Sequence, residues 1–265
     1  MLLGGKELAS YIKQRHLEQV RALPRPPKLA IVMSIAADAA TRVYVRSSKS
    51  RYGEDIGALI DVHEIDGDSA SVKRLISKLN HDSAVTGIIV QLPFPGVDTD
   101  EVIRSVAPSK DVDGLHPDSE YEPATPKAIF WLLSSYGISW KDKTVGVVGQ
   151  GRLVGLPLSN MLEASKAAKV IRCDISTKNL SQTLQSCDIV ISAVGKPNLI
   201  TTEMISPGCV VVDAGTAEID GNLVGDVDHY LYGREGIKIT PNPGGVGPMT
   251  VAALFDNLLI AALKQ

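Results

Sequence analysis

The strongest constraint on the fold is a regular alternation of short apolar runs with helix-length amphipathic stretches. In the first half, the apolar runs predict strands at 29–33, 58–65 and 87–92. The amphipathic stretches before and between them predict helices at 8–23, 39–55 and 71–79. The second half repeats the pattern, with strands at 144–148, 169–173, 188–193 and 209–213, helices at 126–136, 155–164 and 248–263, and a hairpin at 218–224. Strands that alternate with helices predict parallel βαβ units and an α/β fold.

The composition narrows the range of partners. The 265 residues carry a formal net charge of −3 without a basic stretch, so we expect no nucleic-acid partner. We read no apolar run that approaches the roughly 20 residues of a membrane span, and no cleavable signal segment, which predicts a cytoplasmic protein without a membrane partner. The three cysteines read as small buried hydrophobes, and the five scattered histidines predict no metal site.

A glycine-rich turn follows the strand predicted at 144–148. A strand, such a turn and a helix together can bind a pyrophosphate through backbone N–H groups. Gly149 and Gly151 fit the first two positions of the dinucleotide fingerprint, but Val154 occupies the third and Gly155 follows one residue later. A tight structural turn is therefore an open alternative at this point.

Asp174 strengthens the dinucleotide interpretation. It follows the next predicted strand, about 25 residues after Gly149, where an acidic residue can accept the ribose hydroxyls of NAD. The alternative is a solvated aspartate at a strand end.

Six strings, in chain order, resemble the bifunctional methylenetetrahydrofolate dehydrogenase/cyclohydrolase family. They are GIIVQLPFP at 87–95, KDVDGLHP at 110–117, PATP at 123–126, VGVVGQGRLVGLP at 145–157, LVGDVD at 223–228 and ITPNPGGVGPMT at 239–250. The matches extend over nearly the whole chain, from about Gly5 to Ala262, and the strings around Gln91, Asp113 and Gly244 are highly specific together.

The resemblance implies two domains with a folate cleft between them. A folate-binding and catalytic α/β domain would comprise 1–120 and 247–265, with the last helix returning to it, and a Rossmann-type dinucleotide-binding domain would comprise 121–246. The implied activity is oxidation of 5,10-methylenetetrahydrofolate with NAD or NADP, followed by hydrolysis of the methenyl product to 10-formyltetrahydrofolate. A homodimer is implied. Rival hypotheses are a dehydrogenase-only member, a dehydrogenase acting on another small substrate, and a folate- or nucleotide-binding protein without catalysis.

The family's functional residues carry over position by position. The resemblance implies that Asp113 binds the pterin ring and that Gln91 orients a catalytic lysine, whereas the residues alone would read as a turn former and a strand-end polar group. The implied catalytic residues are Lys49, Gln91 and Asp113. The implied folate-binding residues are Tyr44, Gln91, Leu92, Pro93, Asp113, Gly244, Gly245, Val246 and Pro248. The implied cofactor-binding residues are Gly149, Gln150, Gly151, Arg152, Val154, Gly155, Asp174, Ser176 and Thr216.

The chain departs from the family between the folate-site tyrosine and lysine. The family places them four residues apart on one helix, but Tyr44 and Lys49 are five apart, while the upstream and downstream anchors both fit. In a regular helix Lys49 would point about 140° away from Tyr44. A π-bulge would absorb one inserted residue and restore the shared face. Alternatively, Ser48 occupies the lysine position and Lys49 is a solvated helix residue.

The turn and the following strand favour NAD over NADP. Gln150 has no charge to pair with a 2′-phosphate, and Asp174 would repel one by roughly 4 kcal/mol per charge pair at an effective dielectric constant of about 20. NADP stays open, because basic and hydroxyl side chains that could hold a phosphate lie nearby, namely Arg172, Ser176, Thr177 and Lys178.

Overall fold

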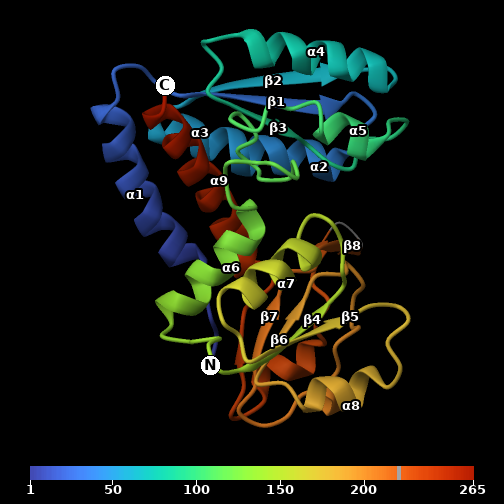
Figure 1. The fold of residues 1–265 in the computed structure, drawn as a ribbon. Coiled ribbons are helices and arrows are strands. Elements are labelled where there is room, and N and C mark those ends of the chain that lie inside the picture. Colours follow the sequence, from blue (N-terminus) through green and yellow to red (C-terminus); the bar gives the residue numbers. More distant parts are fainter. Residues whose placement is uncertain (220–221) are drawn as a thin grey trace. The chain divides into compact units, whose positions relative to one another are not determined.

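The computed structural model describes residues 1–219 and 222–265 (Figure 1). The chain divides into two compact units. The first unit is Ser10–Ala124 with Val251–Gln265, and the second unit is Met1–Ala9 with Thr125–Thr250. The chain passes between them within helices α1 (Lys6–Ala22), α6 (Ala124–Ser135) and α9 (Val246–Leu263).

The chain's first residues pack in the second unit. Leu2 forms a parallel bridge with Ile239, and the Leu3 N–H donates to the Ile239 carbonyl at 2.8 Å. Residues 1–9 are predicted to belong to the first domain, whereas they belong to the second compact unit.

The first unit is built on a three-stranded parallel sheet. Its order is β2 (Leu59–Ile65), β1 (Lys28–Ser34) and β3 (Gly87–Val90). The central strand β1 is buried from Leu29 to Ser34, as expected for a parallel strand covered on both faces. Helices α4 (Ser69–His81) and α5 (Thr99–Ile103) each begin after an aspartate, Asp68 or Asp98, that accepts a backbone N–H of the first turn.

One long helical segment between β1 and β2 has three parts. It comprises α2 (Ala39–Tyr44), the π-helix η1 (Val45–Ser50) and α3 (Arg51–Ile56). It ends at Gly57, whose positive φ of 83° closes the helix in the left-handed region that glycine adopts without strain. The segment therefore spans the predicted helix, with an irregular turn in its middle.

The second unit is built on a five-stranded parallel sheet. Its strand order is β10 (Lys238–Ile239), β7 (Val210–Asp213), β6 (Ile189–Ser192), β4 (Thr144–Val148) and β5 (Lys169–Cys173). The chain runs from β4 outward to β5 and then crosses to β6 on the other side, which creates a topological switch point beside β4. The register aligns the carboxyl ends of four strands, at Cys173, Val148, Ser192 and Asp213. Loops that follow these strands therefore share one edge of the sheet.

Shorter elements complete the second unit. Helix α7 (Gly155–Ala164) follows β4, and α8 (Leu180–Gln185) follows β5. The short strands β8 (Ala217–Ile219) and β9 (Asn222–Val224) pair antiparallel, as predicted for the hairpin at 218–224, and the two residues between them lie outside the described residues. Two 3₁₀ helices, η2 (Thr202–Met204) and η3 (His229–Gly233), lie in the loops. The three cysteines are free and buried, as expected.

Helix α9 is long and strongly apolar. By length and composition alone its 18 residues could cross a membrane, with a mean hydropathy of 1.7, but 61% of this window is buried within the structure. That degree of burial is typical of a core helix, and Asn257 on α9 donates to the carbonyls of Val112 and Glu122 in the first unit. The predicted α/β fold, with the last helix returning to the first unit, is confirmed.

Candidate active site and dinucleotide site

The π-helix η1 places Lys49 on the same side as Tyr44. The N–H of Arg51 donates to the carbonyl of Arg46, five residues back, which is the hydrogen-bond pattern of a π turn. Lys49 Nζ lies 5.7 Å from the centroid of the Tyr44 ring. The predicted π-bulge is confirmed, and it restores the shared face that a regular helix would lose.

Lys49 is a buried lysine with one amide partner. Its side chain lies among residues of the first unit with only 7% exposure, so the alternative of a solvated helix lysine is wrong. Lys49 Nζ donates to Gln91 Oε1 at 2.8 Å, and Gln91 Nε2 donates to the Leu92 carbonyl at 2.8 Å. Because the second bond fixes the amide, the oxygen of Gln91 faces the lysine.

Asp113 is held beside this pair by a hydrogen-bonded loop. Asp111, two residues before Asp113, forms a parallel bridge with Ile88 of β3, and the Asp113 carbonyl accepts the Ala124 N–H at 3.1 Å. Gly114 follows with φ +74°, and a Cβ there would lie 2.6 Å from Pro123 N, so only glycine fits. The loop therefore fixes a half-buried carboxylate near the lysine.

Burial and mutual attraction set the charge state of this cluster. Burial lowers the pKa of Lys49, and the Asp113 carboxylate opposes that change. Burial raises the pKa of Asp113, and the Lys49 ammonium opposes it. Burial raises the pKa of Tyr44 to about 12, with a further contribution from Asp113, so its phenol stays protonated. A lysine with a depressed pKa can exchange a proton near neutral pH more readily than a solvated one.

Burial also perturbs a second carboxyl group in the same loop. It raises the pKa of Asp111 to about 6, although the His116 N–H donates to Asp111 Oδ2 at 2.7 Å and lowers it. The hydrogen bond holds the loop after Asp113, so Asp111 supports the loop and leaves Asp113 to face Lys49.

The remaining predicted folate residues lie in two places. Leu92 and Pro93 follow Gln91 directly, joined by a cis peptide bond, and Pro93 is exposed. Gly244, Gly245, Val246 and Pro248 lie in the second unit. There Gly244 has φ +108° and its carbonyl accepts the Gly5 N–H at 2.8 Å. The structure thus brings Tyr44, Lys49, Gln91 and Asp113 together within the first unit.

The glycine turn of the second unit has the geometry of a phosphate cradle. Gly149 has φ +88°, and a Cβ there would lie 2.6 Å from the Ala193 carbonyl oxygen. A Cβ on Gly155, the first residue of α7, would overlap the Gly149 carbonyl oxygen, whereas a Cβ on Gly151 would meet nothing within 4 Å. The outer two glycines are therefore needed for packing, and the middle one leaves open backbone at the helix N-terminus. These residues fit a dinucleotide pyrophosphate even though the strict fingerprint fails at Val154.

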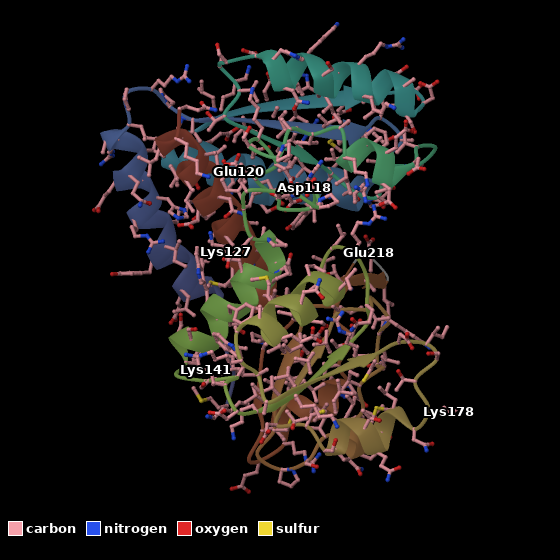
Figure 2. All side chains as sticks on the ribbon, in the orientation of Figure 1. Asp118, Glu120, Lys127, Lys141, Lys178 and Glu218 are labelled. Atoms are coloured by element: carbon pink, nitrogen blue, oxygen red, sulfur yellow. The ribbon has the colours of Figure 1, made fainter. Side chains whose placement is uncertain are left out.

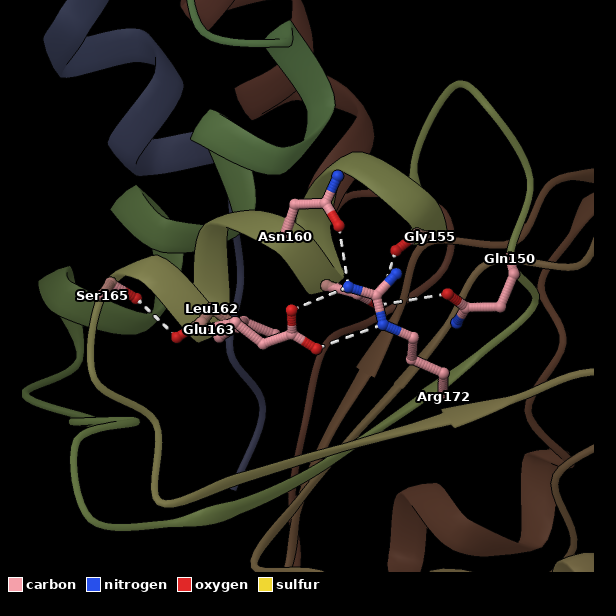
Figure 3. A network of polar contacts seen from close by, with 8 residues as sticks. Gln150, Gly155, Asn160, Leu162, Glu163, Ser165 and Arg172 are labelled. Atoms are coloured by element: carbon pink, nitrogen blue, oxygen red, sulfur yellow. Dashed lines mark hydrogen bonds and ion pairs between the residues drawn. The ribbon is translucent and has the colours of Figure 1, made fainter.

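Two polar side chains near this turn are bound to the protein itself (Figure 3). Gln150 Nε2 donates to the Val147 carbonyl at 3.0 Å, and Gln150 Oε1 accepts from Ser159 Oγ at 3.3 Å. The Arg172 guanidinium donates to Glu163 Oε2 at 2.9 Å and to Asn160 Oδ1 at 2.7 Å, so it is tied to α7. Arg152 is exposed.

Asp174 presents an exposed carboxylate after β5. Its Oδ1 accepts from the Ser176 N–H at 2.8 Å and from Ser176 Oγ at 2.7 Å, and these bonds lower the pKa of Asp174. The Lys178 side chain is exposed in the same loop (Figure 2). Thr216, also exposed, follows β7 at the same edge of the sheet. The predicted cofactor residues therefore gather at the carboxyl edge, where doubly wound sheets bind nucleotides.

Comparisons with known proteins identify the family of the chain. The family model for the catalytic domain of tetrahydrofolate dehydrogenase/cyclohydrolase matches residues 3–113, and the model for its NAD(P)-binding domain matches residues 123–265. The chain belongs to this family. The bifunctional protein FolD of Hydrogenobaculum sp. is 41% identical to this family member, with 100% of this chain and 99% of the relative covered.

Solved structures of other family members share the fold. The bifunctional enzyme FolD of Campylobacter jejuni superposes with a TM-score of 0.94 at 35% identity, covering 100% of this chain and 99% of that chain. The Trypanosoma brucei enzyme, solved with NADP and an inhibitor, superposes with a TM-score of 0.92 at 29% identity, covering 100% and 97%.

The sequence did not indicate Asp226, a buried residue that organises the dinucleotide edge of this family member. Its carboxylate accepts from Ser192 Oγ at 2.6 Å, from the Val194 N–H at 2.8 Å and from the Lys196 N–H at 2.7 Å. It thereby shapes the loop after β6. The only signal in the sequence was its place in the string at 223–228, because its partners lie about 30 residues away.

Proposed function

We propose that this family member oxidises 5,10-methylenetetrahydrofolate to the methenyl compound and then hydrolyses it to 10-formyltetrahydrofolate, with Lys49, Gln91 and Asp113 as its catalytic residues. The observation that carries this proposal is the buried contact of Lys49 with Gln91, beside Tyr44 and Asp113. The inserted residue could have separated these groups, and the π-helix keeps them together. The groups that we propose for hydrolysis therefore lie together in the first unit.

For the oxidation, the first unit positions the substrate. The bound dinucleotide supplies the hydride acceptor. The Tyr44 ring offers a flat, protonated surface for the folate, and the Asp113 carboxylate accepts hydrogen bonds from the pterin. Both groups fix the methylene carbon relative to the protein, which lowers the entropic part of the barrier.

For the hydrolysis, Lys49 holds and moves a proton. Water adds to the methenyl carbon, and the neutral Lys49 Nζ takes one of its protons, which leaves a neutral carbinol. The ammonium then returns that proton to the ring nitrogen as the C–N bond breaks. The carbinol C–OH becomes the formyl C=O, and its proton leaves to solvent, so the hydrolysis releases one proton overall. Gln91 Oε1 accepts from Lys49 Nζ and directs its remaining hydrogens and lone pair. The lowered pKa of Lys49 provides the neutral form, and a cationic substrate beside it would lower the pKa further.

For the dinucleotide, we propose a preference for NAD over NADP. The support comes from the exposed carboxylate of Asp174 after β5 and from Arg172, whose guanidinium is tied to Glu163 and Asn160 on α7. Asp174 would repel a 2′-phosphate by roughly 4 kcal/mol per charge pair. Even a third of this energy corresponds to a change of about tenfold in affinity. The NADP complex of the Trypanosoma brucei relative shows that the family also uses NADP. Steady-state kinetics with both cofactors decide: a larger kcat/KM for NADP would overturn the preference.

The predicted domains, assembly and location belong to the same proposal. Residues 1–120 with 247–265 would bind folate and residues 121–246 the dinucleotide, in a cytoplasmic homodimer. The expectation of a dimer rests on family membership, and light scattering of the purified chain measures it directly: a mass near twice 28.2 kDa supports the dimer, and 28.2 kDa contradicts it.

One absorbance assay separates this function from its rivals. The purified protein is mixed with methylenetetrahydrofolate and NAD or NADP, and methenyltetrahydrofolate is followed over time. We expect turnover of both compounds. Accumulation of the methenyl compound without hydrolysis would indicate a dehydrogenase alone, and no turnover would indicate a binding protein or another substrate.

A further inference from the structure

The extra residue between Tyr44 and Lys49 could have been accommodated in two ways. A regular α-helix with one more residue turns everything after it by about 100° and moves it by about 1.5 Å along the axis. A π turn instead absorbs the residue locally and leaves both flanking helices in register. The structure shows the second arrangement, so contacts at both ends of the segment should explain why the first is prevented.

The upstream end is fixed by Asp38 and Arg42. The Asp38 carboxylate accepts the Thr41 N–H at 2.6 Å and caps α2. Arg42 Nε donates to the Ala37 carbonyl at 3.1 Å, and Arg42 Nη1 donates to Glu64 Oε2 at 2.6 Å. Tyr44, two residues later, therefore keeps its place.

The downstream end is fixed by a buried group that we name the clasp, made of Tyr52, Gly53, His16 and Phe255. The Tyr52 hydroxyl bonds His16 Nδ1 at 3.0 Å, and the Tyr52 ring stacks on Phe255 with centroids 4.9 Å apart. His16 is completely buried, and its Nε2 lies 3.4 Å from Asp256 Oδ1. The clasp thus joins residues of α1, α3 and α9, and its first residue on α3, Tyr52, lies three positions after Lys49.

Gly53 adds a packing constraint to the clasp. A Cβ on Gly53 would overlap Ile60 Cδ1 and lie 2.9 Å from Phe255 Cζ. If the helix turned by about 100°, a neighbouring residue with a side chain would replace glycine at this contact. The same rotation would take the Tyr52 hydroxyl away from His16.

We infer that the clasp is a positioning device for the hydrolysis: it holds α3 in register, forces the extra residue into the π-helix and so keeps Lys49 on Gln91. The inference rests on the proposed function, because it assigns the clasp a part in the same reaction. Tyr52 and His16 act through Lys49 and are positioning residues.

The test combines Tyr52→Phe with deletion of Ser47, an exposed residue of the π-helix. Tyr52→Phe removes the hydroxyl and keeps the stacked ring. Deletion of Ser47 restores an interval of four between tyrosine and lysine, so that a regular α-helix places the lysine correctly without a π turn. Tyr11→Phe on α1, where Tyr11 is 78% exposed, is the matched control. His16→Gln replaces the imidazole ring that is the other partner of this hydrogen bond.

Two readouts are measured on each protein: hydrolysis of methenyltetrahydrofolate alongside the dehydrogenase rate, and amide hydrogen exchange of the peptide that contains the π-helix. We expect Tyr52→Phe and His16→Gln to slow hydrolysis by about tenfold or more, with a smaller effect on the dehydrogenase, and to speed exchange across 45–50. In the background without Ser47, the same substitutions should change both readouts by less than about twofold, and Tyr11→Phe should change neither.

Two results would overturn the inference. One is an equal loss of hydrolysis from Tyr52→Phe in the chains with and without Ser47. The other is no change in hydrolysis or exchange when Tyr52→Phe is made in the chain that keeps Ser47. If the unaltered protein hydrolyses no methenyltetrahydrofolate, the proposed hydrolysis fails, and the exchange readout still decides whether the clasp holds the π-helix.

Discussion

The two proposed sites of this protein differ in which part of the chain binds and reacts: side chains in the first unit and backbone in the second. In the first unit, the proposed chemistry depends on the side chains of Lys49, Gln91 and Asp113, which a π turn and a hydrogen-bonded loop hold together. In the second unit, the proposed dinucleotide recognition depends mainly on the backbone, because a Cβ on Gly149 or Gly155 would collide with neighbouring atoms and Gly151 leaves the helix N-terminus open.

This difference predicts how each region responds to mutation. Side-chain chemistry at a buried cluster depends on single functional groups, so substitutions there should change the rate of one step. Backbone recognition depends on shape, so substitutions there should change dinucleotide affinity and stability together. The predictions that follow test this contrast, from the largest expected effect to the smallest.

Lys49→Met should nearly abolish hydrolysis and affect hydride transfer less. The methionine preserves bulk but removes the proton carrier, and a general acid–base group contributes about 10²–10⁴-fold in rate. Single-turnover hydrolysis of methenyltetrahydrofolate and the dehydrogenase rate are measured on the same preparation. Wild-type hydrolysis in the variant would show that Lys49 has no part in the reaction.

Asp113→Ala should weaken folate binding by about 1–3 kcal/mol, or about 5- to 150-fold, because pterin donors would lose their acceptor. Isothermal titration with tetrahydrofolate gives the affinity, and thermal unfolding controls for the fold. Folate affinity equal to that of the unaltered protein would remove Asp113 from the folate site.

Gly155→Ala should weaken dinucleotide binding and destabilise the second unit together. The added methyl group would meet the Gly149 carbonyl, and such overpacking costs about 1–3 kcal/mol. The matched control is Gly233→Ala in η3 of the same unit, where a Cβ meets nothing within 4 Å. A loss of folate affinity with unchanged dinucleotide affinity would contradict the contrast between the two regions.

Asp174→Ser should raise kcat/KM for NADP by about tenfold, because the repulsion of the 2′-phosphate is removed. It should leave the rate of hydrolysis unchanged, since that step belongs to the first unit. Kinetics with both cofactors give the ratio, and an unchanged ratio would show that Asp174 does not read the ribose.

The pH dependence of hydrolysis should follow Lys49. The neutral amine is the active form, so the rate rises with pH, and its midpoint lies below 10.5 because burial lowers the pKa of Lys49. Asp113→Asn should move the midpoint to lower pH, because the carboxylate that raises this pKa is removed. A midpoint that moves to higher pH in the variant would contradict this assignment.

Much of the fold could be predicted because its main strands are continuous apolar runs. The strands of 169–173 and 144–148 were predicted at their observed limits. Helices α5 and α8 were not, because five or six residues contain too few turns to show a helical period. Strand β10 has two residues and depends on its partner β7. The N-terminal residues join the second unit through a bridge to Ile239 that no local pattern shows.

The candidate site was predicted unevenly for a related reason. The strings around Gln91 and Asp113 identified residues that the structure places near Lys49, and the interval from Tyr44 to Lys49 predicted the π turn. The clasp and Asp226 were missed, because their partners are far apart in the sequence: His16 and Tyr52 are separated by 36 residues, and Ser192 and Asp226 by 34. Contacts of this kind become visible only when the fold is known.

The most direct test of the role of the π-helix is to exchange two neighbouring residues, with Ser48→Lys and Lys49→Ser in one protein. The composition is unchanged, and only the position of the lysine moves by one. The π-helix directs position 49 to Gln91, so we predict that methenyltetrahydrofolate hydrolysis is lost while the dehydrogenase persists. Hydrolysis at or above the rate of the unaltered protein would show that position 48 faces the substrate, and would contradict the role of the π-helix.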